Sequence, residues 1–215
     1  MGEYNPVDAG MNTEILRAGY PGAINHAIDV LNHGGLVAFP TDTVYGLAAI
    51  PFKCEYIEGL FSAKGRNNSR AIAILIGDYP DLERVVEHFD EKAQRLAHRF
   101  WPGPLTLVVS KLPSLPDELS PDKTIGVRMP DHPIALAILR QIGPLAVTSA
   151  NISGQGNAIT AEEVSRQLNG RVHLILDGGK TTGGIPSTVV NCVSSLPTVL
   201  RQGPITVEAI QEALS

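Results

Sequence analysis

The sequence predicts a single α/β domain, a twisted mixed sheet covered by helices. Short apolar runs such as 36–40 and 71–76 alternate with segments whose apolar residues recur at helical spacing, which is typical of strands separated by helices. Two later runs, 172–176 and 187–191, are separated only by a loop, so the sheet is expected to be mixed. Apolar residues make up 43% of the 215, enough for a substantial core, and no Ser/Pro-rich linker divides the chain.

The N-terminal part is expected to be an arm followed by a helix. Residues 1–20 are polar and contain glycine, so we expect a flexible arm there and a folded domain over 21–215. Apolar residues then recur every three or four positions over 23–31, and Gly34 follows this segment. This pattern predicts an amphipathic helix that ends at glycine.

Strands and helices then continue to alternate to the end of the chain. Short apolar runs, most of them bounded by Gly or Pro, predict strands over 36–40, 71–76, 105–109, 124–128, 145–148, 172–176, 187–191 and 198–200. Helical spacing predicts helices over 57–64, over 81–100 as two helices broken near residue 89, and over 132–141, 160–168 and 206–214. Thr160 and Glu163 have the spacing of a capping box, which supports a helix start there.

Charge and cysteine content exclude several classes of protein. The chain has 17 Lys and Arg against 22 Asp and Glu, a net charge of -5, which argues against a protein that coats duplex nucleic acid through bulk positive charge. Cys54 and Cys192 form no CxxC pair, so a structural zinc site has no ligand set. No apolar run approaches the length of a membrane span. We therefore expect a cytoplasmic protein with no membrane partner.

Familiar nucleotide-binding motifs do not fit. A Gly-Lys-Thr triplet begins at Gly179, but Leu174 stands where the phosphate-binding loop of nucleoside triphosphatases requires glycine. Gly154 and Gly156 open like a dinucleotide loop, but Ile159 stands at the third glycine position. A nucleotide site in this chain therefore needs another design.

Polar clusters instead flank the predicted strands. They lie at 40–46, 64–70, 124–128, 149–151 and 183–188. Open α/β sheets bind ligands at the carboxyl ends of their strands, so these clusters predict one concave ligand site.

The clusters hold cations and neutral polar groups but few acids. The cations are Lys64, Arg66, Arg70, Arg128 and Arg201. Such groups suit phosphate or carboxylate oxygens. Asp42 is the only carboxylate, and neither a paired acid nor a Ser-His-Asp spacing indicates covalent catalysis. The residues predict a site that binds and positions an anion.

Each cluster alone also has an ordinary structural explanation. Lys64 and Arg66 could be a solvated loop pair, and 41–43 and 149–151 could be turn or capping residues. Their joint occurrence favours a ligand site.

Six motifs occur in order along the chain. They read FPTDTVYGL (39–47), KGR (64–66), WPGPLTLV (101–108), GVRMPDHP (126–133), TSANISG (148–154) and PSTVV (186–190). Together they resemble the motifs of the YrdC-type threonylcarbamoyl-AMP synthases. The likeness covers about residues 22 to 205 and fits the short form of the family, without the extra C-terminal domain of longer members. It implies a YrdC-like fold with a concave pocket.

The resemblance also implies a reaction in which L-threonine, bicarbonate and ATP, with Mg²⁺, give threonylcarbamoyl-AMP and pyrophosphate. The product serves the threonylcarbamoyladenosine modification next to the tRNA anticodon, so tRNA and a downstream threonylcarbamoyl transferase complex are implied partners. By position, the residues implied for threonine are Thr43, Arg128, Val147 and Ser187. Those implied for ATP are Lys64, Arg66, Arg70, Thr124, Ser149, Asn151, Asn157 and Arg201, with Lys64 and Arg66 in the catalytic role on the phosphates. No protein ligand to the metal is expected.

Some positions depart from the family pattern. Asn67 and Ala71 replace prolines, Arg70 stands where Asn or Lys is common, and Leu75 replaces a threonine-contacting His of some members. Two alternatives therefore stay open, an RNA-binding module and a related enzyme that forms a carbamoyl adenylate.

Overall fold

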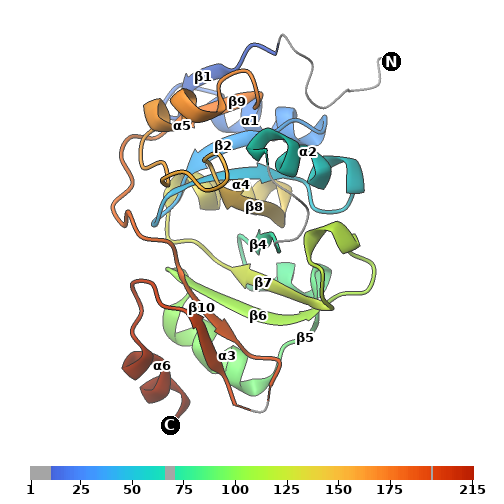
Figure 1. Cartoon of the computed structure of the whole chain (residues 1–215), viewed down its shortest axis with the longest axis vertical. Coiled ribbons are helices and arrows are strands. Elements are labelled where there is room, and N and C mark those ends of the chain that lie inside the picture. The colour runs from blue at the N-terminus through green and yellow to red at the C-terminus, as the bar shows by residue number, and fades with distance from the viewer. Residues whose placement is uncertain (1–10, 66–70, 195) are drawn as a thin grey trace.

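The computed structural model describes residues 11–65, 71–194 and 196–215, and these form one eleven-stranded mixed sheet with helices on its faces (Figure 1). The strands are β1 (Glu14–Arg17), β2 (Val37–Pro40), β3 (Tyr45–Ala49), β4 (Ala73–Leu75), β5 (Val86–His88), β6 (Leu105–Lys111), β7 (Thr124–Arg128), β8 (Leu145–Ser149), β9 (Leu174–Asp177), β10 (Thr188–Asn191) and β11 (Thr198–Arg201). The helices are α1 (Ala23–Asn32), α2 (Cys54–Lys64), α3 (Glu91–Phe100), α4 (Pro133–Ile142), α5 (Ala161–Leu168) and α6 (Val207–Leu214). Short 3-10 turns are η1 (Tyr79–Arg84) and η2 (Asp117–Leu119). The predicted α/β fold class is confirmed.

The strand order brings distant parts of the chain together. The order is β1-β9-β2-β3-β8-β4-β7-β6-β10-β11, and β5 pairs with β6. Parallel pairs such as β1 with β9 and β6 with β10 stand beside antiparallel pairs such as β2 with β3 and β6 with β7. In Figure 1 the sheet runs from β1 and β9 at the top to β10 near the C-terminus, with α3 and α6 beside it there.

Two predictions about the elements are wrong. Within the expected arm over 1–20, Glu14–Arg17 pairs in register with β9 as an edge strand, while 1–10 lie outside the described residues. In place of a first helix within 81–100, the chain forms η1 and then the short strand β5, and only α3 is a true helix. β3 was not expected as a strand because its residues 45 and 46 belong to a polar motif.

Capping matches the sequence prediction closely. The Thr160 side chain accepts a hydrogen bond from the Glu163 amide, and the Glu163 carboxylate accepts one from the Ile159 amide. Two otherwise unpaired donors at the start of α5 are thus satisfied. His132 is the N-cap residue of α4, as expected from the proline that follows it.

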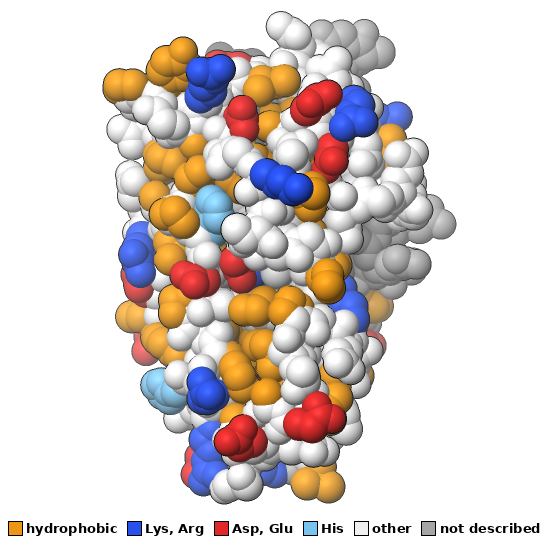
Figure 2. All heavy atoms as spheres, turned by 90° about the vertical axis from the view of Figure 1, so that its left-hand side faces the viewer, with side chains coloured by type: hydrophobic (Ala, Val, Ile, Leu, Met, Phe, Trp, Pro, Cys, Tyr) orange, Lys and Arg blue, Asp and Glu red, His pale blue; other side chains and the backbone are white. Residues whose placement is uncertain are grey.

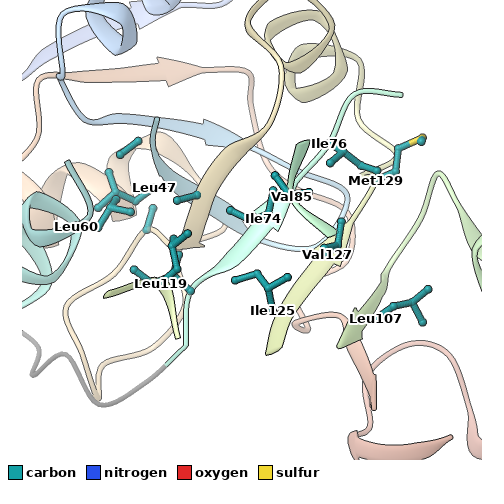
Figure 3. Close-up of a cluster of buried hydrophobic side chains, with 14 of the residues drawn as sticks. Leu47, Leu60, Ile74, Ile76, Val85, Leu107, Leu119, Ile125, Val127 and Met129 are labelled. Carbon is teal, nitrogen blue, oxygen red and sulfur yellow. The ribbon is translucent and has the colours of Figure 1, made fainter. Parts of the chain in front are cut away.

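The sheet buries a separate hydrophobic cluster on each face. The larger cluster packs α2, α3 and α5 against alternate strand residues, among them Leu47, Ile74, Leu107, Ile125 and Val127 (Figure 3). The smaller cluster packs α1 and α4 against the opposite face, where Phe39, Ala48, Leu75 and Val147 point. Alternation along each strand decides which face a side chain serves.

The face that carries α1 and α4 is only partly covered. Those helices contact one another and β2, while α1 also contacts β9. Leu75 and Ala48 belong to the cluster under these helices. Ala73 and Gly46 lie two residues before them, hence on the same face of their strands, and they line a cavity. The cavity therefore begins where the helix layer stops.

The described surface carries mixed charge. On the face shown in Figure 2, Lys and Arg side chains are scattered among Asp and Glu side chains, with apolar atoms between them. Among the described residues, none of the helices is long and apolar enough to cross a membrane.

Candidate active site

A cavity of about 460 Å³ opens over the middle of the sheet. It is lined by residues of seven strands and their connecting loops, including Thr41, Thr43, Ala73, Thr106, Gly126, Arg128, Val147, Ser149, Asn157, Ser187, Val189 and Arg201. Its size falls in the range of pockets that hold small molecules and cofactors. The predicted concave site is present.

Glycine residues in the strands beneath the cavity leave room for a ligand. A Cβ atom on Gly126 would lie 3.0 Å from Thr106 Cγ2 and 3.6 Å from Ala73 Cβ. A Cβ atom on Gly46 would lie 2.7 Å from Val147 Cγ1. Because these positions face the cavity, their missing side chains leave space that a ligand can fill.

The turn after β2 supplies a chain of hydroxyl groups. Thr41 Oγ1 donates to the Val44 carbonyl at 2.7 Å and lies 3.0 Å from Thr43 Oγ1. A hydroxyl has one proton, so Thr43 must donate to Thr41, which leaves Thr43 Oγ1 free to accept from Arg128 Nη1 at 3.0 Å. This chain fixes the direction of each hydroxyl.

Arg128 is the buried cation of the site. Its Nε donates to the Gly103 carbonyl at 3.0 Å, its Nη1 to Thr43, and its Nη2 to the carboxylate of Asp42. Burial lowers the pKa of Arg128, the carboxylate of Asp42 opposes that shift, and the nearby Arg201 adds to it. A guanidinium keeps its charge even so. Two of its five N–H groups have no partner among the described residues.

Arg201 and Ser187 join the last two strands at the cavity wall. Arg201 donates through Nε and Nη2 to the Ser187 carbonyl at 3.1 and 2.9 Å. Ser187 Oγ lies 2.8 Å from Thr106 Oγ1, which ties β10 to β6. Burial lowers the pKa of Arg201, and the group stays a cation at neutral pH.

Lys64 is buried beside the loop that follows β8. It ends α2, and its ammonium donates to the carbonyls of Ser149 and Asn151, the latter at 2.6 Å. Asn151 uses its Nδ2 on the Ile152 and Gln155 carbonyls, whereas its buried Oδ1 has no partner among the described residues. Lys64 and Asn151 therefore hold the loop that presents Ser149, and neither lines the cavity.

The predicted site residues divide into three groups. Those that line the cavity are Thr43, Arg128, Val147, Ser149, Asn157, Ser187 and Arg201. Those described but outside its lining are Lys64, Thr124 and Asn151. Thr124 lies at the start of β7, four residues before Arg128, opposite Ser110 on β6. Arg66 and Arg70 lie outside the described residues.

Sequence reasoning did not assign several lining residues. Thr106, Gly126 and Val189 lie at alternate positions of predicted strands, on the face opposite the core. The alternation of apolar and other residues was the available signal for Thr106 and Gly126, whereas Val189 is one of two adjacent valines and has no such signal. Asp42 was noted as a carboxylate but given no role.

Comparison with known proteins decides the family. The model of the Sua5/YciO/YrdC family, described as "Telomere recombination", matches residues 29–203. The chain belongs to this family.

Relatives in the Sua5/YciO/YrdC family share most of this chain. The threonylcarbamoyl-AMP synthase of Bacillus subtilis is 43% identical over 197 residues, which cover 89% of this chain and 56% of that protein. A Mycobacterium tuberculosis relative is 41% identical over 189 residues, 87% of each chain. The chain thus spans little more than half of the Bacillus relative and most of the mycobacterial one.

Solved structures of the Sua5/YciO/YrdC family share the fold. The crystal structure of Pyrococcus abyssi Sua5 complexed with L-threonine matches with a TM-score of 0.89 and 37% identity, over 94% of this chain and 60% of that chain. Escherichia coli YciO matches with a TM-score of 0.82 and 26% identity, over 94% of this chain and all of that one. The family's mixed sheet is the one described above.

Proposed function

We propose that this protein is an L-threonylcarbamoyladenylate synthase. It would form threonylcarbamoyl-AMP and pyrophosphate from L-threonine, bicarbonate and ATP, for the threonylcarbamoyladenosine modification of tRNA. The observation that carries the proposal is the cavity in which Arg128 and Arg201 lie among hydroxyl groups, in a chain 43% identical to a threonylcarbamoyl-AMP synthase. The related Pyrococcus abyssi Sua5 was solved with L-threonine, which supports the amino-acid half of the reaction.

Threonine would bind at the Arg128 end of the cavity. The two unpaired N–H groups of that guanidinium suit both oxygens of an α-carboxylate. Thr43, Ser187 and the wall near Val147 line the same cavity and would contact the rest of the amino acid. Leu75 also lines it, as an apolar surface for the threonine methyl group.

ATP would occupy the remainder of the cavity. Ser149, Asn157 and Arg201 line it. Lys64 and Asn151 would act on ATP indirectly, by fixing the position of Ser149. The ammonium of Lys64 donates to the carbonyls of Ser149 and Asn151. We assign Arg66 and Arg70 to the phosphates, and Thr124 to ATP, on the family resemblance.

The chemistry needs no protein nucleophile. The deprotonated threonine amine and bicarbonate give a carbamate and water. A carbamate oxygen then forms a bond to the α-phosphorus of ATP while the bond from that phosphorus to the bridging oxygen breaks and pyrophosphate leaves. Both reactants are anions, so the enzyme's contribution is positive charge and orientation.

Mg²⁺ is expected to enter with ATP, held by phosphate oxygens and water. In the described part of the chain no three His, Cys, Asp or Glu side chains lie together as a metal-binding group.

The product would be passed to a transferase that acts on tRNA. A carbamoyl adenylate is a reactive mixed anhydride, so a downstream transferase complex that accepts it is the expected partner. We place the reaction in the cytoplasm, where ATP and tRNA are available.

An isotope assay tests the function directly. Purified protein, ATP, Mg²⁺ and labelled bicarbonate are incubated with each amino acid in turn. We expect a labelled adenylate with threonine and with no other amino acid. If none of the amino acids gives a labelled adenylate, the function is refuted. Arg128→Gln should lose at least tenfold in kcat/KM. Arg140→Gln is its matched control, since Arg140 on α4 is exposed, pairs with Asp78 at 3.5 Å and does not line the cavity.

The same preparation tests the two alternatives. Salt-dependent RNA binding with no adenylate would indicate an RNA-binding module. Label from carbamoyl phosphate and none from bicarbonate would indicate the related carbamoyl-adenylate enzyme.

A further inference from the structure

Asp42 is the charged partner of Arg128 and is not among the residues that line the cavity. Its Oδ1 accepts from Arg128 Nη2, and the side chains of the two residues are 12% and 7% exposed. Thr41, Thr43 and Arg128 line the cavity, whereas Asp42 does not. Asp42 is thus placed to act on the arginine and not on a ligand.

Three partners define the orientation of the guanidinium. The carbonyl of Gly103, the hydroxyl of Thr43 and the carboxylate of Asp42 each take one N–H group, from three different nitrogen atoms. A planar group held at all three nitrogens cannot rotate about its axis without losing a hydrogen bond. Of the three partners, only Asp42 carries charge.

Charge at this end of the cavity favours an anion. Arg128 and Arg201 both line the cavity, and Asp42 pairs with Arg128 and neutralises one of the two positive charges. The set of Asp42, Arg128 and Arg201 therefore carries one net positive charge. The α-carboxylate of an amino acid would bind beside this positive charge at Arg128, with Arg201 on the ATP side of the cavity.

From this geometry we infer that Asp42 is a positioning residue for amino-acid binding, which holds Arg128 so that its two unpaired N–H groups are presented to the α-carboxylate of the substrate. The inference rests on the proposed function and extends it to a residue that does not touch the ligand. Asp42 Oδ2 is buried and without a partner among the described residues, so the carboxylate meets Arg128 through Oδ1.

The test separates binding from turnover. Threonine binding to the full chain is measured by calorimetry without ATP, and pyrophosphate release is measured with threonine and ATP varied in turn. Asp42→Asn keeps the shape of the side chain and removes its charge. It should weaken threonine binding and raise the threonine KM by tenfold or more, while the ATP KM stays within twofold. Asp42→Glu, which retains a carboxylate at altered reach, should lie between Asp42→Asn and the wild type.

Asp78→Asn is the matched control. Asp78 also pairs with an arginine, at 3.5 Å, but both side chains are more than half exposed and neither lines the cavity. It should leave threonine binding unchanged. Because Asp42 would act through Arg128, adding Asp42→Asn to Arg128→Gln should weaken threonine binding no further.

Each result has a definite meaning. A threonine affinity of Asp42→Asn within twofold of the wild type would overturn the inference. So would a rise in the ATP KM as large as the rise in the threonine KM, or a double variant that binds threonine more weakly than Arg128→Gln alone. An Asp42→Glu protein as weak as Asp42→Asn would also overturn it. If the wild type binds threonine and Asp42→Asn does not, but no adenylate forms, the inference stands and the proposed function fails. If the wild type binds no threonine, both fail.

Discussion

Replacing Thr188 with valine should destabilise the protein because one hydroxyl makes three hydrogen bonds. Thr188 is the first residue of β10 and is fully buried. Its Oγ1 donates to the Ile205 carbonyl at 2.8 Å and accepts from the amides of Gly203 and Ile205 at 2.9 and 3.0 Å. Valine has nearly the same shape but can make none of these bonds.

The size of the effect follows from the groups left unpaired. The Ile205 amide and carbonyl are buried, and each unpaired buried group costs about 1–3 kcal/mol. The Gly203 amide is only partly buried and can turn to water, so it adds little. We expect a loss of about 3 to 4 kcal/mol in the free energy of unfolding. For a chain of this length that lowers the melting temperature by about 6–16 °C.

Thermal unfolding of three proteins checks the reasoning. Thr188→Ser keeps the hydroxyl and loses one methyl group, which should cost only about 1 kcal/mol. Wild type, Thr188→Ser and Thr188→Val should therefore melt in descending order, with the larger gap before valine. If Thr188→Val melts within about 3 °C of the wild type, or above Thr188→Ser, the hydroxyl is not what anchors residues 203–205.

Three further changes test the cavity and its supports. Gly126→Val should lower threonine-dependent activity at least tenfold, because its side chain would enter the cavity beside Thr106; Gly156→Ala, where a Cβ meets nothing within 4 Å, is the kinetic control. Lys64→Met should raise the ATP KM and lower the melting temperature together, because two carbonyls of the Ser149 loop lose the ammonium; a change in only one of these quantities would contradict that role. Burial raises the pKa of Tyr45 to about 12 from 10.0, so the folded protein disfavours the ionised phenol. The free energy of unfolding, measured by denaturant titration, should therefore be unaffected by Tyr45 below pH 10 and fall by about 2–3 kcal/mol as pH rises to 12. Tyr45→Phe should remove that decline, and an unchanged pH profile would contradict the assignment.

The strands that sequence predicts best are those with β-branched residues and alternating burial. β7 matches its predicted bounds at Thr124–Arg128, and β10 is found within its predicted range. β3 escaped prediction because its sequence, Tyr-Gly-Leu-Ala-Ala, is poor in β-formers and follows a polar turn. Its place between β2 and β8 comes from tertiary packing that no local pattern encodes.

The site shows the same limit. Residue type was enough to select Arg128 and Arg201 as ligand-binding cations. The partner of Arg128 could not be predicted, because Asp42 lies 86 residues away along the chain and meets it only through the strand order. Lys64 was selected as a phosphate ligand, but the fold places its ammonium on backbone carbonyls, a contact that depends on how α2 ends against β8.

The strand order also governs when the site can exist during synthesis of the chain. The wall of the cavity takes residues from Thr41 to Arg201, and β1 pairs with β9 across about 160 residues of sequence. Contacts this distant form late and make folding slow. A growing chain would have no complete cavity wall until β11 has left the ribosome and Arg201 has reached Ser187. Substrate could then stabilise the finished protein but could give no help to any earlier stage of folding.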